Sequence, residues 1–272
     1  MEYKRILTIQ DISCVGQCSM TVAMPILSAW GHETCILPTA MLSTHTGGFG
    51  TPAILRFEDA LEDIWRHWQK NNISFDAILV GYLGSISAIH TTMDIMDNLL
   101  APGGISIVDP VMGDNGKLYS GFDMAYAEEM KILCCRADMI LPNVTEASLL
   151  SGIPYQDIMK EDYVNSLLHS LNHPCTVLTG VGYGADQTGV VLYQQGSGTY
   201  YPQRKLGGSF HGTGDIFAAS FTGSFMSGNS LEKSLKIAEK FTENAIQNTV
   251  ENPAHWYGVK FEPLLSQIKQ ML

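Results

Sequence analysis

A glycine-rich run in the last third of the chain carries the residues best suited to chemistry. Gly212-Thr213-Gly214-Asp215 is followed by small and apolar residues in a helical pattern. Such a turn aims backbone N–H groups at one point, where the helix dipole adds positive potential. Asp215 stands in the first helical turn, beside a place where negative charge can be held. The run predicts an oxyanion hole with a neighbouring base; the alternative is an ordinary loop with a capping aspartate.

Carboxylates also follow two apolar runs that are typical of strands. Asp109 follows 105–108, and Asp114 comes five residues later. Magnesium takes one or two carboxylates together with phosphate oxygens, so this pair is a candidate magnesium site, with a simple turn as the alternative. Asn143 follows the next apolar run, and Glu146 three residues on completes the pattern of a helix capping box. A capping Glu146 also points toward the strand ends, so both roles are compatible.

Two other glycine-rich segments are candidate binding loops. The segment 180–184, directly after Thr179, has a misplaced third glycine for a dinucleotide fingerprint and no helix after it, which favours a loop near a mononucleotide. The segment 43–50 has the polar groups to hydrogen-bond a small polar ring, or it is an exposed loop. We expect His32, His67 and His169 to lie on the surface.

Alternating strand and helix patterns must position these residues. The strand patterns are near-continuous Ile, Val and Leu, as expected for a sheet covered on both faces, and the alternation implies a mostly parallel sheet. No linker or repeat interrupts them, so we predict a single domain over 1–272. Strands are expected over 5–10, 34–37, 77–81, 105–109, 139–141, 176–179, 189–192 and 199–201, and helices over 19–29, 57–70, 85–100, 122–133, 144–150, 161–171, 215–227, 231–250 and 261–271.

A general rule for parallel sheets predicts that these residues form one site. Ligands of open parallel sheets bind beyond the carboxyl ends of the strands. The polar residues that we expect directly after strands are Gln10-Asp11, Gly81-Tyr82, Asp109, Asn143 and Thr179-Gly180. They converge on one edge, where the Gly212–Asp215 turn can join them.

The composition narrows the function classes. The chain has 272 residues, 45% hydrophobic and 16% charged, with a net charge of −11. No basic stripe is visible, so binding to nucleic acid is not expected. No apolar run reaches the length of a membrane span, and no signal segment precedes the first strand, so we expect a cytoplasmic protein. The six cysteines lack zinc-site spacing and are interpreted as buried, reduced thiols.

With these motifs in chain order, the sequence resembles the pyridoxal kinase family of the ribokinase-like superfamily. The resemblance runs from about residue 5 to about residue 228. Asp109-Pro110-Val111-Met112-Gly113-Asp114, Pro142-Asn143-x-x-Glu146 and Gly212-Thr213-Gly214-Asp215 occur in several vitamin kinases, whereas Ser43-x-His45-Thr46-Gly47 and Gly81-Tyr82-Leu83-Gly84-Ser85 point more narrowly to pyridoxal kinases.

The resemblance implies a three-layer α/β/α sandwich and an activity. The family phosphorylates the 5′-hydroxymethyl group of pyridoxal, pyridoxine and pyridoxamine with ATP and Mg²⁺, and a homodimer is its usual state. Asp215 is then the catalytic base, with Gly212, Thr213 and Gly214 as the anion hole. Asp109, Asp114 and Glu146 lie near the phosphates and the metal, Asn143 and Thr179 line the nucleotide side, and Thr46 and Tyr82 line the vitamin side.

One position departs from the family. Asp11 stands where the family usually has Ser against the pyridine ring. A carboxylate there can pair with a protonated ring nitrogen or with an amine substituent, so it bears on which vitamer is preferred; otherwise it turns to solvent or caps the helix near Cys18. Two alternative functions remain at this point, a hydroxymethylpyrimidine kinase of the same fold and a non-catalytic vitamin- or nucleotide-binding protein.

Overall fold

The computed structural model describes residues 3–207, 210–252 and 254–271. Within them, nine strands form one sheet in the order β11-β10-β9-β8-β5-β4-β1-β2-β3. The central strands run parallel. The edge strands β3 and β11, and β10 beside β11, run antiparallel to their neighbours. The parallel strands are β1 Arg5–Ser13, β2 Glu33–Leu42, β4 Phe75–Val80, β5 Leu100–Val108, β8 Met139–Ile140 and β9 Cys175–Thr179; the antiparallel ones are β3 Ile54–Arg56, β10 Gln187–Gln194 and β11 Ser197–Arg204.

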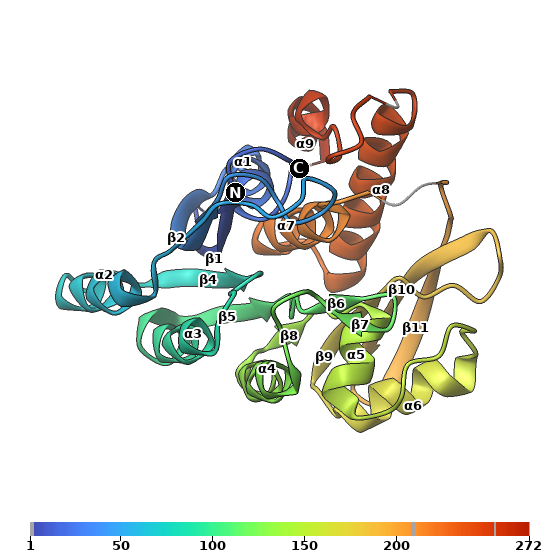
Figure 1. Ribbon diagram of the computed structural model, residues 1–272, viewed down its shortest axis with the longest axis horizontal. Coiled ribbons are helices and arrows are strands. Elements are labelled where there is room, and N and C mark those ends of the chain that lie inside the picture. Colours follow the sequence, from blue (N-terminus) through green and yellow to red (C-terminus); the bar gives the residue numbers. More distant parts are fainter. Residues whose placement is uncertain (1–2, 208–209, 253, 272) are drawn as a thin grey trace.

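Helices cover both faces of this sheet, as Figure 1 shows. One layer consists of α1 Met20–Ala29, α7 Thr213–Met226, α8 Leu231–Val250 and α9 Leu265–Met271, the last preceded by a 3₁₀ turn, Glu262–Leu264. The other consists of α2 Glu58–Lys70, α3 Ile86–Leu99, α4 Met124–Arg136, α5 Val144–Ser151 and α6 Glu161–Leu171. The three-layer sandwich with a mostly parallel sheet is therefore confirmed.

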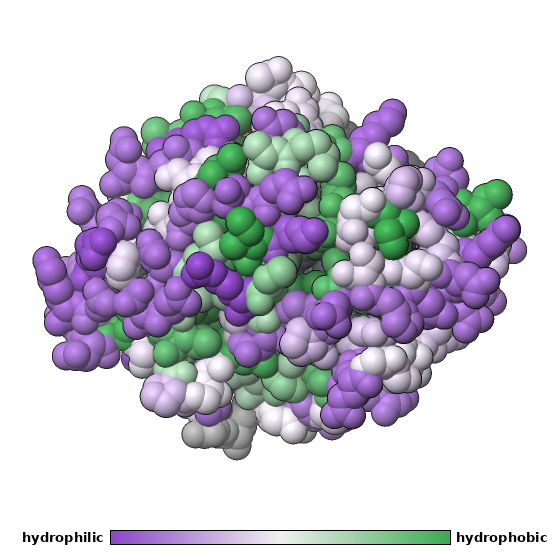
Figure 2. Space-filling view, turned by 90° about the horizontal axis from the view of Figure 1, so that it is seen from below, coloured by the Kyte–Doolittle hydropathy of each residue, from purple (hydrophilic) through white to green (hydrophobic). Residues whose placement is uncertain are grey.

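The alternation of side chains along the central strands explains the two layers. In β4, Ala77 and Leu79 belong to the core under α1, α7 and α8, whereas Ile78 and Val80 belong to the core under α2, α3 and α4. Successive strand residues point to opposite faces, so an unbroken apolar run fills both cores at once. On the side of the molecule where α4 and α6 lie, Figure 2 shows hydrophilic residues around smaller groups of hydrophobic ones.

The strand order reverses beside β1. The chain passes from β1 to β2 and β3 on one side and then crosses to β4 on the other. In open α/β sheets a crevice forms at the carboxyl ends of the strands where the order reverses. The crevice between β1 and β4 is therefore where the topology favours a ligand.

Several sequence-based predictions need correction. The first strand does not end at Gln10: after a bulge, Ile12 and Ser13 still pair with β2, so Asp11 lies within the strand. The strand β3 and the hairpin β6 Gly113–Asp114 with β7 Lys117–Leu118 were not predicted, because two or three residues are too few for a periodic pattern.

Some burial predictions also need correction. His32 was expected on the surface, but it is buried and bonds the Gly223 carbonyl oxygen. All six cysteines are free thiols, yet Cys14 and Cys135 are exposed rather than buried. Among the described residues, no helix is long and apolar enough to cross a membrane.

Candidate active site

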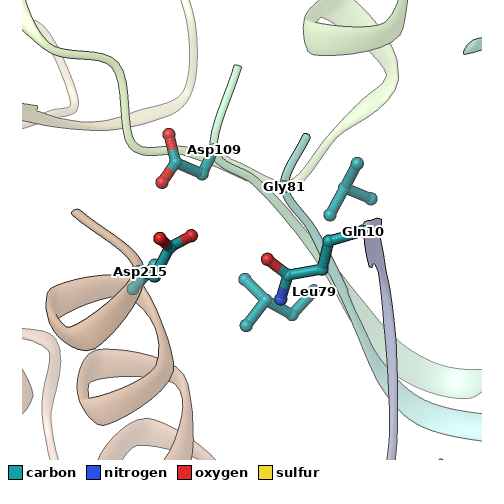
Figure 3. Close-up of a pocket in the computed structure, with 7 residues that line it drawn as sticks. Gln10, Leu79, Gly81, Asp109 and Asp215 are labelled. Atoms are coloured by element: carbon teal, nitrogen blue, oxygen red, sulfur yellow. The ribbon is translucent and has the colours of Figure 1, made fainter. Parts of the chain in front are cut away.

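A small pocket lies at the β1–β4 crevice. Its walls come from β1, β4 and the loop after it, the end of β5 and the first turns of α7. In Figure 3 the carboxylates of Asp109 and Asp215 face each other across the pocket, and the amide of Gln10 reaches toward them from β1. The lining residues are Gln10, Leu79, Val80, Gly81, Asp109, Asp215 and Ala218. The topology therefore brings two of the predicted carboxylates together.

The turn before α7 requires glycine. Gly212 is the N-cap residue with a left-handed φ of 84°, and a β-carbon there would overlap the carbonyl oxygen of Gln17. Gly214 is less restricted, because a β-carbon on it would meet only Asp109 Oδ2, at 3.9 Å. The close approach of the turn to Gln17 fixes where α7 begins, and the first N–H groups of the helix point out of its N-terminus.

Asp215 occupies the first turn of α7. Burial raises its pKa to about 7, and the charge of Asp11 adds to the shift, while a hydrogen bond from the backbone N–H of Ser19 opposes it. A carboxylate with a pKa near 7 is suited to accept a proton at neutral pH.

Ser19 hydrogen-bonds both Asp215 and Asp11. It has a φ of 52° at the N-cap of α1, a conformation rarely adopted by residues other than glycine. Its backbone N–H bonds Asp215, and its hydroxyl bonds Asp11. Sequence reasoning missed Ser19, since no local pattern announces a left-handed serine.

Asp109 lies near two other carboxyl groups, those of Asp215 and Glu146. Burial raises the pKa of Asp109 well above its ordinary value, and the charges of Glu146 and Asp215 raise it further. Burial likewise raises the pKa of Glu146 to about 8. Neighbouring carboxylates with raised pKa values favour the arrival of a cation, which would restore their charged forms.

Glu146 also has a structural role. Asn143 and Glu146 form the predicted capping box: Glu146 Oε2 accepts the Asn143 backbone N–H at 2.8 Å, and Asn143 Oδ1 accepts the Glu146 N–H at 2.9 Å. Glu146 Oε1 accepts the Met112 backbone N–H at 3.2 Å. The same carboxylate therefore caps α5 and holds the loop after Asp109.

Asp114 lies apart from the buried carboxylates. It is exposed in the β6–β7 hairpin, where its oxygens accept hydrogen bonds from the backbone and the side chain of Asn115, at 2.8 Å and 3.0 Å. In the described part of the chain, no three His, Cys, Asp or Glu side chains form a ready-made metal site. The predicted acidic residues supply charge around the pocket without forming a closed set of ligands.

The two residues predicted for the nucleotide side lie next to each other. Asn143 and Thr179 form an isolated parallel bridge, and Asn143 Nδ2 donates to the Gly113 carbonyl oxygen at 2.9 Å. The loop after Thr179 leads into the antiparallel strand β10, not into a helix. The prediction that no helix follows this loop is therefore confirmed.

The residues predicted for the vitamin side differ in burial. Asp11 is buried, Tyr82 is half-buried, and Thr46 is exposed. Burial and the charge of Asp11 raise the pKa of Tyr82, which places the phenol near that carboxylate. The Tyr82 ring also packs on Phe122, with ring centroids 5.4 Å apart.

A cluster of rings beside the pocket was not predicted. His45 is buried, and its ring centroid lies 4.7 Å from that of His211 and 5.0 Å from that of Phe49. Its Nε2 lies 2.6 Å from the Tyr257 carbonyl oxygen. The 43–50 loop, the Gly212 turn and the segment after α8 thus meet at one place, and these contacts between irregular segments leave no periodic signal in the sequence.

The three-layer fold, with a half-buried carboxylate at a helix N-terminus beside the strand-order reversal, defines a small-molecule kinase of the ribokinase-like class. A family model described as phosphomethylpyrimidine kinase matches residues 59–259. The chain therefore belongs to the phosphomethylpyrimidine kinase family.

Its relatives include several pyridoxal kinases. The chain is 25% identical to the pyridoxal kinase of Arabidopsis thaliana over 91% of this chain and 83% of that protein. It is 28% identical to the pyridoxal kinase of Homo sapiens over 79% of this chain and 75% of that protein.

Two solved structures resemble this one over nearly their full length. The pyridoxal kinase of Lactobacillus plantarum is 34% identical, with a TM-score of 0.92 over 99% of this chain and 98% of that one. A protein of Bacteroides thetaiotaomicron described as a putative phosphomethylpyrimidine kinase, in a crystal form with pyridoxal, is also 34% identical, with a TM-score of 0.92 over 98% of this chain and 96% of that one.

Proposed function

We propose that this protein is a pyridoxal kinase, which transfers a phosphoryl group from ATP to the 5′-hydroxymethyl group of pyridoxal, pyridoxine and pyridoxamine. The observation that carries the proposal is the position of the Asp215 carboxyl group, which lies in the first turn of α7, lines the pocket with Asp109, and has its pKa raised to about 7 by burial. Full-length similarity to pyridoxal kinases supports it.

Asp215 acts on the acceptor alcohol. It orients the hydroxyl and takes its proton as the oxygen attacks, while the first N–H groups of α7, at Gly212, Thr213 and Gly214, face the transferring phosphoryl group. Because the transition state of phosphoryl transfer is loose, positioning and electrostatic stabilisation carry the catalysis.

Magnesium fits the acidic surroundings of the pocket. Asp109 and Glu146 are buried, with raised pKa values, and exposed Asp114 is available through water. Mg²⁺, when bound with ATP, supplies positive charge that offsets the phosphates and these carboxylates. Asn143 and Thr179 are proposed for the nucleotide side, and Tyr82, Thr46 and Asp11 for the vitamin side.

Three further properties belong to the same proposal. We expect one domain over the whole chain, because the sheet joins strands from Arg5 to Arg204. We expect a homodimer by resemblance to the family. The cytoplasm is the expected location, since six free thiols suit a reducing compartment.

One assay separates this function from its nearest alternative. ATP consumption is measured with pyridoxal, pyridoxine, pyridoxamine and hydroxymethylpyrimidine in parallel, and the phosphorylated product is identified by mass spectrometry. We expect vitamer 5′-phosphates and little reaction with the pyrimidine. The family description and the Bacteroides protein's description favour the pyrimidine as the second candidate, and preferential phosphorylation of the pyrimidine would establish it instead. A chain that binds ligands without consuming ATP would be a non-catalytic binder.

A further inference from the structure

Asp11 is a buried carboxylate next to Gln10, which lines the pocket. Its side chain is only 3% exposed, so it neither turns to solvent nor leaves the strand to cap α1. Ser13 Oγ donates to Asp11 Oδ2 at 3.1 Å, and the Ser19 hydroxyl also bonds the carboxylate. Its neighbour Gln10 lines the pocket together with Asp215.

No cation pairs with this carboxylate within the described residues. None of the ion pairs that they form includes Asp11. His45 is the nearest candidate, but the Gly47 N–H donates to its Nδ1 at 3.0 Å. The proton must then sit on Nε2, which donates to the Tyr257 carbonyl oxygen. Both ring nitrogens of His45 thus contact Gly47 and Tyr257, so the ring forms no ion pair with Asp11, although a charge on it lowers the pKa of Asp11.

The other groups around Asp11 are neutral or acidic. Burial and the charge of Asp11 raise the pKa values of Tyr82 and Cys18, so both side chains remain protonated. Asp215 carries the same sign of charge and its pKa responds to Asp11. In the part of the chain that the structure describes, Asp11 is hydrogen-bonded only by the Ser13 and Ser19 hydroxyls and by its own backbone N–H. A buried carboxylate with such neutral partners keeps much of its desolvation penalty, which a ligand cation can relieve.

We propose that Asp11 makes the acceptor pocket selective for vitamers that carry an ammonium group, so that pyridoxamine is preferred over pyridoxal and pyridoxine. This inference rests on the proposed function. The three vitamers share the pyridine ring and the 5′-alcohol and differ at one substituent, which only in pyridoxamine is a cationic aminomethyl group. A charge-assisted hydrogen bond to Asp11 is stronger than one to a neutral hydroxyl.

The test compares all three vitamers in wild type, Asp11→Asn and Asp11→Ser. Asp11→Asn keeps the shape of the side chain and removes its charge, whereas Asp11→Ser restores the usual family residue. Asp94→Asn on the exposed side of α3 is the matched control, because it removes one negative charge far from the pocket. For each protein, kcat/KM is measured by ADP release at saturating MgATP, vitamer affinity by calorimetry, and folding by thermal melting.

We expect wild type to favour pyridoxamine, and both Asp11 variants to lower its kcat/KM relative to pyridoxal at least about tenfold. The affinity for pyridoxamine should fall in parallel, and Asp94→Asn should leave the ratio unchanged. An equal loss of kcat/KM for all three vitamers would overturn this inference but not the proposed function, because Asp11 would then bind the shared ring nitrogen. An unchanged ratio of pyridoxamine to pyridoxal would also overturn this inference and leave the proposed function standing. No phosphorylation of any vitamer by wild type would overturn the proposed function.

If the Asp11 variants fail to fold, the wild-type protein still tests the inference. Binding of pyridoxine and pyridoxamine is then compared at pH 7 in calorimetry. Tighter binding of pyridoxamine supports selection by charge, and tighter binding of pyridoxine contradicts it.

Discussion

At the scale of single residues, the proposed chemistry depends on Asp215. We expect Asp215→Asn to lower kcat at least about a hundredfold, a typical contribution of a general base, while ATP affinity changes little. In wild type, kcat should fall as the pH drops below about 7, because burial raises the pKa of Asp215 to that value and only its deprotonated form accepts a proton. Steady-state kinetics across pH and nucleotide calorimetry measure these effects. Turnover near the wild-type level in the variant would remove Asp215 from this role.

Glu146 has two proposed roles that one substitution can separate. Glu146→Gln leaves one oxygen where two now accept the N–H groups of Asn143 and Met112, and it removes the charge near Asp109. We expect the Mg²⁺ concentration for half-maximal rate to rise severalfold, measured by titrating Mg²⁺ at fixed ATP. Ser230→Ala removes the cap of α8 and is the comparison for capping alone, which typically lowers stability by about 1 kcal/mol. If Glu146→Gln lowers only the melting temperature, Glu146 acts through the cap.

At the scale of elements, the Gly212 turn decides whether α7 starts in the right place. Gly212→Ala meets both the left-handed φ and the Gln17 carbonyl oxygen. We expect a melting temperature at least roughly 4 °C lower, from about 2 kcal/mol of strain, together with a large loss of kcat. Gly214→Ala is the matched control, because its methyl group has space and φ there is not left-handed. Equal melting temperatures for the two variants would contradict a role of Gly212 in fixing the turn.

The sequence predicted the fold best where the strands and helices have a regular pattern of apolar residues. Long apolar strands and amphipathic helices fixed the order of the layers, and the strand-end rule placed Gly81 and Asp109 at one pocket. The first strand was expected to end at Gln10, but it continues to Ser13 and includes Asp11, because the bulge that extends β1 depends on pairing with β2. The contact of His45 with Tyr257 joins two irregular segments 212 positions apart, and nothing local encodes it. The roles assigned to individual site residues remain predictions.

At the scale of the whole molecule, buried acids should make stability depend on pH. Glu239 on α8 is buried, and its Oε1 has no hydrogen-bond partner in the described part of the chain. Burial raises its pKa to about 7. The folded state thus binds the proton more tightly than the unfolded state, so stability falls as the pH rises from about 4.5 to about 7.

Glu239→Gln should remove this part of the pH dependence. We expect the variant to melt roughly 3 °C above wild type at pH 8 and close to wild type at pH 5, with differential scanning calorimetry as the measurement. Glu128→Gln on the exposed side of α4 is the control for the loss of one charge. A constant difference between Glu239→Gln and wild type at both pH values would show that Glu239 stays ionised throughout.

The ring cluster beside the pocket also has a consequence for the newly made protein. The pocket draws on Gln10, Gly81, Asp109 and Asp215, and the ring cluster draws on His45 and Tyr257, which follows α8. A polypeptide translated only as far as β11 has the strands of the pocket but lacks both Asp215 and Tyr257. We therefore expect products that stop before α7 to be inactive.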